Sequence, residues 1–310
     1  MSGQGVERQG GVRSLALPDG HEERRIALPD GRGLGYREYG DPRGYPVIHC
    51  HGGLVCGLDV ATAHEAAKAL GLRLLAPDRP GIGLSTPRPG RTTADFADDV
   101  AAFADALHLP RFGTLGWSLG GQYALAVAAR LPERTSAVVV VAGSLPLDAR
   151  KIAELSLTDR RLLRLAERSP TTCRVVFATM GAFARATPGF FTSLSARELC
   201  ESDREVLAGL PEGAFARWFA LALRQPRGMV EEYRAWMRPW GFEPSEVGCP
   251  TTIWQGTGDT LVPLEWGRLL TASIGHATLR LLRDEGHFLA FPRWTEVLRP
   301  FSPEARGAGA

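Results

Sequence analysis

Short apolar runs alternate with amphipathic stretches along most of this chain, after a Pro-Asp-Gly turn at 29–31 that predicts a hairpin. The runs that predict strands are 46–50, 72–76, 112–116, 137–142, 251–255 and 277–282. The stretches that predict helices are 61–70, 93–107, 119–131 and 264–273. Alternation of this kind is typical of the α/β class, with a mostly parallel, twisted sheet flanked by helices.

The alternation stops between residues 145 and 245, where the pattern is helical and rich in arginine. Both ends of this segment flank predicted strands of the same sheet. We therefore expect a helical cap at 145–245, inserted into a core formed by 24–144 and 246–300. The Gly-rich, polar start at 1–23 and the end at 301–310 are predicted to be flexible tails.

Composition and charge narrow the partners that this chain is expected to have. The 310 residues include 36 basic and 34 acidic side chains, without a run of like charges, so nucleic acid is not an expected partner. No apolar run approaches the ~20 residues that span a bilayer, and no signal peptide is evident, so we expect a cytoplasmic protein that does not bind membranes. Five cysteines, an odd number, favour reduced thiols. The sequence does not indicate an oligomeric state.

The strongest local motif is Gly-Trp-Ser-Leu-Gly-Gly at 116–121, a G-x-S-x-G between a predicted strand and a predicted Ala-rich helix. A serine on so sharp a turn is held in a strained backbone conformation, with its hydroxyl exposed. The N-terminus of the following helix directs free N–H groups toward negative charge that forms nearby. Because a Gly-rich turn can also carry an idle serine, the setting matters more than the motif. Ser118 is the candidate nucleophile.

An activated serine needs a base and an acid that orients the base, and the chain offers both after predicted strands. His287 follows the last predicted strand, and Asp259 follows the one before it. The competing interpretation of Asp259 is a helix N-cap. An acid placed one strand earlier is disfavoured, because the loop after Ala142 contains no carboxylate before Asp148. The order Ser118, Asp259, His287 is thus predicted to form a catalytic triad.

A site for the oxyanion is predicted after the strand that ends at Cys50. Small residues in His51-Gly52-Gly53 let backbone N–H groups approach a reacting oxygen, and we assign this donation to Gly53 and Leu119. A metal site at His49 and His51 is the alternative, since the two imidazoles share one face of a strand. No further Cys or His at ligand spacing completes four ligands, so neither a metal nor another cofactor is expected.

These motifs resemble the α/β-hydrolase family over about residues 24 to 300, with the cap matching in position alone. The markers are His51-Gly52-Gly53, the segment Asp78-Arg79-Pro80-Gly81-Ile82-Gly83-Leu84-Ser85, the elbow at Ser118, and Asp259 with His287. In similar family members the segment that starts at Asp78 is structural and shapes the site from below, so the resemblance implies no catalytic role for it.

Departures from subfamily patterns narrow the expected activity. Serine at 118 is unlike haloalkane dehalogenases and epoxide hydrolases, whose nucleophile is a carboxylate. Leu54-Val55 replaces the Pro-Gly that follows His-Gly-Gly in proline iminopeptidases. No proline stands beside Gly53, as it does in cofactor-free haloperoxidases. The chain is expected to be a serine hydrolase that acts by acyl transfer on a carboxylic ester of a small apolar molecule.

Other activities on this scaffold remain open at this point. They are hydrolysis of a carbon–carbon bond or a lactone, a non-hydrolytic lyase or cyclase reaction, and ligand binding alone, because the fold does not fix the function. The aromatic residues of the predicted cap suit an apolar ligand, but they also suit the cap's own core.

Overall fold

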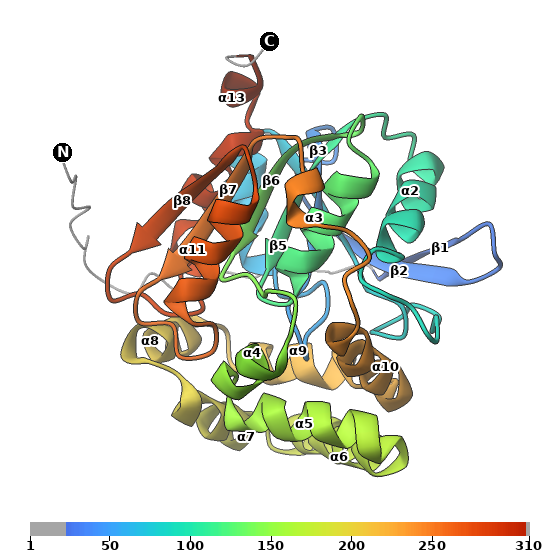
Figure 1. Cartoon of the computed structure of the whole chain (residues 1–310), viewed down its shortest axis with the longest axis vertical. Helices are drawn as coiled ribbons and strands as arrows, with labels where there is room; N and C mark the ends of the chain where they lie inside the picture. Colours follow the sequence, from blue (N-terminus) through green and yellow to red (C-terminus); the bar gives the residue numbers. More distant parts are fainter. Residues whose placement is uncertain (1–22, 308–310) are drawn as a thin grey trace.

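The expected alternation of strands and helices is present in the computed structural model of the protein, which describes residues 23–307 (Figure 1). The strands are β1 (Arg24–Ala27), β2 (Gly33–Gly40), β3 (Tyr45–Cys50), β4 (Leu72–Pro77), β5 (Phe112–Trp117), β6 (Thr135–Val141), β7 (Thr251–Gly256) and β8 (Ala277–Leu282). Each strand predicted from the sequence lies within two residues of these bounds. They form one eight-stranded sheet in the order β1-β2-β4-β3-β5-β6-β7-β8.

The sheet is parallel from β4 through β8, and β2 is antiparallel to both β1 and β4. The predicted hairpin turn joins β1 to β2, where Gly31 has φ +83°. The fold class predicted from the sequence, a mostly parallel sheet flanked by helices, is confirmed. Because parallel strands point the same way, the loops after β3, β5, β7 and β8 all lie at the carboxyl ends of the strands, on one side of the sheet.

Burial explains why the central strands read as continuous apolar runs. Val138 to Val141 of β6 are fully buried, as are Val47 and Ile48 of β3. Parallel strands covered on both faces lack the alternation of a half-exposed strand. The edge strand β8 differs, with exposed residues between partly buried ones.

Helices pack around the sheet between the strands. They are α1 (His64–Ala69), α2 (Phe96–Ala106), α3 (Gly120–Arg130), α11 (Leu264–Ser273), α12 (Trp294–Leu298) and the 3-10 turns η1 (Ala61–Ala63), η3 (Pro244–Glu246), η4 (Phe291–Arg293) and η5 (Arg299–Phe301). Helix α3 is buried almost throughout because it packs against both β5 and β6. The helix predicted at 93–107 begins later, at Phe96.

Seven helices lie between β6 and β7 and are here called the helical insert. They are α4 (Ala149–Glu154), α5 (Leu157–Arg168), α6 (Pro170–Ala186), α7 (Pro188–Ser195), α8 (Glu201–Gly209), α9 (Ala214–Ala222) and α10 (Pro226–Met237), with the 3-10 turn η2 (Ala196–Glu198). Side chains of Asp148 and Ser156 cap α4 and α5, and prolines start α6, α7 and α10. The insert lies together below the sheet in Figure 1.

The two predicted tails have different outcomes. Residues 1–22 lie outside the described part of the chain, whereas Glu23 pairs with Arg37 at 2.9 Å. A flexible tail from residue 301 is wrong for its first residues, because Phe301 is fully buried and α13 spans Pro303–Gly307. The Phe301 ring packs over Gly113, where an added Cβ would lie 2.4 Å from it.

Within residues 23–307, no helix combines the length and apolarity needed to cross a bilayer.

Candidate active site

Ser118 occupies a tight turn between β5 and α3. Its φ is +56°, a conformation that a non-glycine residue adopts at a cost in strain. The turn is possible because its neighbours lack side chains: a Cβ on Gly116 would lie 2.4 Å from the carbonyl oxygen of Gly120. A Cβ on Gly120 would lie 1.9 Å from the carbonyl oxygen of Cys50. The G-x-S-x-G pattern therefore has a steric cause in this fold.

His287 and Asp259 come from the loops after β8 and β7 and are hydrogen-bonded to each other. Nδ1 of His287 lies 2.9 Å from Oδ2 of Asp259. The other carboxylate oxygen, Oδ1, accepts from the backbone N–H groups of Leu261 at 2.8 Å and Val262 at 2.9 Å. The carboxylate is thus fixed by its own loop and faces His287. Asp259 does not cap α11, whose N-cap is Pro263.

The environment of His287 favours its protonated form more than that of an ordinary histidine. Burial by itself would lower the pKa of His287, but the charge of Asp259 and its hydrogen bond outweigh that effect, so the pKa is raised. When Nδ1 donates its hydrogen to Asp259, Nε2 is left as the acceptor of a proton. This is the arrangement that a general base requires.

Trp117, the residue before Ser118, supports the loop that carries His287. Its Nε1 donates to the backbone carbonyl of His287 at 3.0 Å. The Trp117 ring also packs against the rings of His287 and Phe288, with centroids 5.4 Å and 5.1 Å apart. The elbow and the His287 loop are therefore linked directly, although 170 residues separate them in the sequence.

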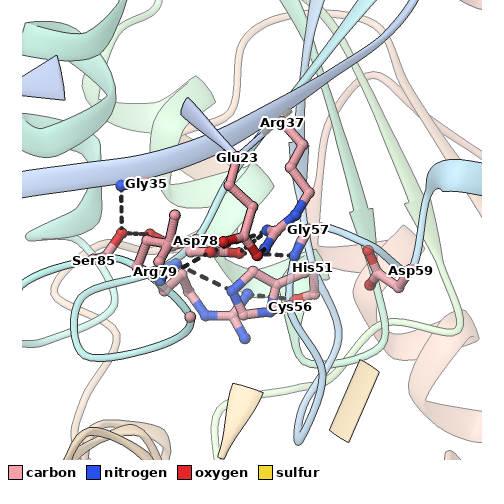
Figure 2. A network of polar contacts seen from close by, with 12 residues as sticks. Glu23, Gly35, Arg37, His51, Cys56, Gly57, Asp59, Asp78, Arg79 and Ser85 are labelled. Atoms are coloured by element: carbon pink, nitrogen blue, oxygen red, sulfur yellow. Dashed lines mark hydrogen bonds and ion pairs between the residues drawn. The ribbon is translucent and has the colours of Figure 1, made fainter. Parts of the chain in front are cut away.

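The loop that carries Gly53 is held by the charged side chains of Arg79 and Asp59; Figure 2 shows Arg79 beside His51. Nη1 and Nη2 of Arg79 donate to the carbonyl oxygens of His51 and Gly52, the latter at 2.9 Å. The Arg79 backbone N–H donates to Nε2 of His51 at 3.1 Å, and Asp59 accepts from the Gly52 N–H at 2.8 Å. With these carbonyl groups engaged, the path of the backbone into Gly53 is fixed.

Ser118, His287, Gly53 and Leu119 all line one cavity of about 520 Å³. The rest of its wall comes mainly from the helical insert, including the aromatic rings of α6, α7 and α9. The cavity thus brings together the predicted nucleophile, base and oxyanion donors beneath the insert. Asp259 does not line the cavity; it contacts His287, and its side chain is fully buried.

The predicted alternative of a metal at His49 and His51 has no support in the side-chain contacts. Nε2 of His49 pairs with Oδ1 of Asp59 at 2.7 Å, while His51 contacts the Gly52 carbonyl and the Arg79 backbone. Over residues 23–307, no group of three or more His, Cys, Asp and Glu is arranged to hold a metal ion.

Comparison with known proteins places this architecture in a family. A family model described as the alpha/beta hydrolase fold matches residues 45–293, which is most of the chain. The chain belongs to the α/β-hydrolase family. Named relatives of this α/β-hydrolase include esterases and other hydrolases, which bears out the expectation that it is an enzyme of this class.

Individual relatives match this α/β-hydrolase over very different lengths. A proline iminopeptidase of Xylella fastidiosa is 32% identical over 120 residues. The matched segment covers 37% of this chain and 37% of that protein. A pimeloyl-(acyl-carrier protein) methyl ester esterase of Chromobacterium violaceum is 27% identical over 253 residues, covering 79% of this chain and 88% of that protein. The enol-lactonase of Burkholderia xenovorans LB400 shares the fold, with a TM-score of 0.69, 21% identity, and coverage of 90% and 99%.

One residue near the candidate site of this α/β-hydrolase was not predicted from its sequence. Asp203 of α8 is buried, and its two carboxylate oxygens accept from the backbone N–H groups of His287 at 2.9 Å and Phe288 at 2.8 Å. Asp203 lies in a helix of alternating charges that reads as a solvated surface. The sequence holds one indication of this contact, the glycine at 286. A Cβ at that position would lie 2.3 Å from the Asp203 carboxylate.

Proposed function

We propose that this chain is a serine hydrolase that works by acyl transfer, most readily on a carboxylic ester of a small, largely apolar molecule. Ser118 is the nucleophile, His287 the general base, and Asp259 the acid that orients His287. The backbone N–H groups of Gly53 and Leu119 are the donors of the oxyanion hole. No metal or organic cofactor takes part in this proposal.

The observation that carries the proposal is the pairing of His287 with Asp259 in the cavity that Ser118 also lines. His287 removes the Ser118 proton through Nε2 while the oxygen attacks the ester carbonyl. The oxyanion that forms is stabilised by the two backbone donors, each of which typically contributes about 3 kcal/mol. His287 then returns the proton to the departing alcohol, and water releases the acyl group by the same steps.

The choice of an ester rests on the cavity and on one relative. The cavity wall is mostly apolar, as expected for a small-molecule site. The Chromobacterium violaceum relative that matches most of both chains is named a methyl ester esterase. We propose further that residues 145–245 act as a cap that selects the substrate, on the core formed by 24–144 and 246–300.

A fluorophosphonate probe tests the nucleophile directly. The probe is expected to label wild-type protein at Ser118, as located by peptide mass spectrometry, and to leave Ser118→Ala unlabelled. Ser193→Ala, which removes an exposed hydroxyl from α7, is the matched control and is expected to label normally. Turnover of p-nitrophenyl esters then tests acyl transfer. Labelling at Ser118 without turnover of any acyl substrate would instead favour a lyase, a cyclase or a ligand-binding protein.

A further inference from the structure

The cavity beneath the helical insert has two chemically different walls. One is aromatic and is formed by Phe183, Phe191, Phe215, Phe219 and Phe288. The other is polar and includes Ser144, Ser156, Thr158, Asp159, Tyr233 and Trp236, and the charged residues Arg197 and Glu198 also line the cavity. A purely apolar substrate would make use of the first wall alone. The mechanism proposed above gives no role to the second wall.

Asp159 is an ionisable residue of the polar wall. It lies in the first turn of α5, and its Oδ1 accepts from the Tyr233 hydroxyl at 2.8 Å. Its Oδ2 accepts from the Ser156 hydroxyl at 3.1 Å. Each carboxylate oxygen can accept two hydrogen bonds, so each has a further acceptor position beyond these two bonds, and Asp159 lines the cavity.

Capping of α5 does not account for this carboxylate. The helix end is capped by the Ser156 hydroxyl, which accepts from the backbone N–H of Asp159 at 3.0 Å. That bond uses the backbone of residue 159 and would be the same with another side chain. The backbone cap of α5 therefore does not require the Asp159 carboxylate, although a negative charge in the first turn also favours the helix N-terminus.

Among residues 23–307, no lysine or arginine forms an ion pair with Asp159, although Arg197 also lines the cavity. The neighbouring Glu198 raises the pKa of Asp159, whereas the charge of His287 lowers it. Burial raises the pKa of Asp159, as expected where its charged form lacks solvent. A partly buried carboxylate that lines a cavity and has open acceptor positions can be satisfied by a donor that arrives with the ligand.

We propose that Asp159, held by Tyr233 and Ser156, forms a subsite that binds a hydrogen-bond donor on the substrate, an ammonium or a hydroxyl group. The aromatic wall binds the apolar part of the same molecule. This inference deepens the proposed function and rests on it, because the donor lies on an ester that Ser118 attacks. The substrate class is thus an amphipathic ester rather than a wholly apolar one.

Charge-assisted hydrogen bonds set the size of the expected effect. A substrate that brings a donor to Asp159 should be favoured over one of the same shape that ends in a methyl group by about 10-fold or more in kcat/KM. A substrate that ends in a carboxylate should be disfavoured, because two like charges would meet in a region of low dielectric constant.

The experiment compares methyl esters of straight-chain acids of increasing length that end in ammonium, hydroxyl, methyl or carboxylate. A second set carries the same end groups on the alcohol side. The variants are Asp159→Asn, which keeps an acceptor oxygen but no charge, and Asp159→Leu, which removes both. Asp148→Asn is the matched control, because it removes a negative charge from an exposed N-cap of the same insert, and asparagine still caps the helix.

Wild type and Asp148→Asn should prefer a donor-bearing ester over the methyl-bearing ester of the same length. In Asp159→Leu that preference should vanish, and turnover of the carboxylate-bearing ester should rise. Retention of the preference in Asp159→Asn identifies hydroxyl as the natural donor, and its loss identifies ammonium. A preference that is absent in wild type at every length, or that Asp159→Leu leaves unchanged, overturns the subsite.

A binding measurement separates this inference from the proposed function. Calorimetry on Ser118→Ala compares an alkylammonium, an alkanol and an alkanoate of equal length, and it needs no turnover. The ammonium or the alcohol should bind at least about 10-fold more tightly than the alkanoate, and adding Asp159→Leu should abolish the difference. Equal binding of all three ligands overturns the subsite even if the protein is an active esterase. The predicted difference together with failed labelling at Ser118 would overturn only the proposed mechanism.

Discussion

The α/β core and the helical insert contribute to the candidate site in different ways. The core supplies Ser118, Asp259 and His287 from loops that directly follow β5, β7 and β8. The insert supplies Asp203 and Asp159, which come from within the first turns of helices. Core residues are placed by short segments whose glycines and turns are visible in the sequence. In the insert, Asp203 is placed against the distant His287 loop, and Asp159 is held by Ser156 and by Tyr233 of α10.

The difference is consistent with the separate tasks proposed for the two regions. Groups that would take part in bond making stand on the rigid sheet edge, where their separation is fixed by strand spacing. Groups from the insert act on these from outside, since Asp203 holds the backbone of the His287 loop and Asp159 faces the cavity. A deletion of the insert would therefore disturb the His287 loop as well as the substrate wall.

Ser118→Ala should have the largest effect, because it removes the proposed nucleophile of the core. We expect kcat to fall by about 10⁴- to 10⁶-fold. The fold should remain intact, since one hydroxyl leaves a turn that no packed side chain depends on. Steady-state kinetics with a thermal-unfolding control measure both. Near-wild-type turnover in this variant would contradict the assignment of chemistry to the core.

Asp259→Asn should follow with a loss in kcat of up to about 10⁴-fold. The amide can hold His287 in the wrong tautomer and cannot stabilise the imidazolium. If Ser118, His287 and Asp259 act as one unit, adding Asp259→Asn to Ser118→Ala should lower the residual rate little further. Additive losses in this double mutant would show that Asp259 acts elsewhere.

Asp203→Ala tests whether the insert positions the base, and a loss of about 10- to 100-fold in kcat is expected. Two buried backbone N–H groups lose their acceptor, so the His287 loop is free to move. The charge of Asp203 also helps to raise the pKa of His287, so the pH limb of activity should shift to lower pH. Glu205→Gln, on an exposed position of α8, is the control. A slower enzyme with an unshifted limb would indicate a purely structural role.

The pH profile of the wild-type enzyme should show the smallest effect. Activity requires neutral His287, whose pKa is raised by Asp259 despite burial, so kcat/KM should rise with pH through a midpoint above the ~6.5 of ordinary histidine. Below the midpoint, His287 carries a proton and cannot accept another from Ser118. A profile that is flat between about pH 5 and pH 8, with stability controlled, would exclude His287 as the base.

The sequence alone predicted a mostly parallel sheet, its alternation with helices, and the three candidate residues of the core. Apolar runs such as Val138 to Val141 mark buried parallel strands because both of their faces are covered. Gly116 and Gly120 mark the elbow at Ser118 because any side chain there would collide with backbone. These signals are local, since a few consecutive residues decide whether the backbone can adopt the required conformation.

Only the tertiary structure revealed the contributions of the insert. Asp203 lies 84 residues before His287, and Glu232 pairs with Arg79 across 153 residues. In an amphipathic helix, a buried acid and a solvated one have the same sequence pattern, because what distinguishes them is the distant group that packs against them. The candidate residues of the core could therefore be predicted from neighbouring residues, while the support that Asp203 gives to the His287 loop and the selection proposed for the insert depend on long-range packing.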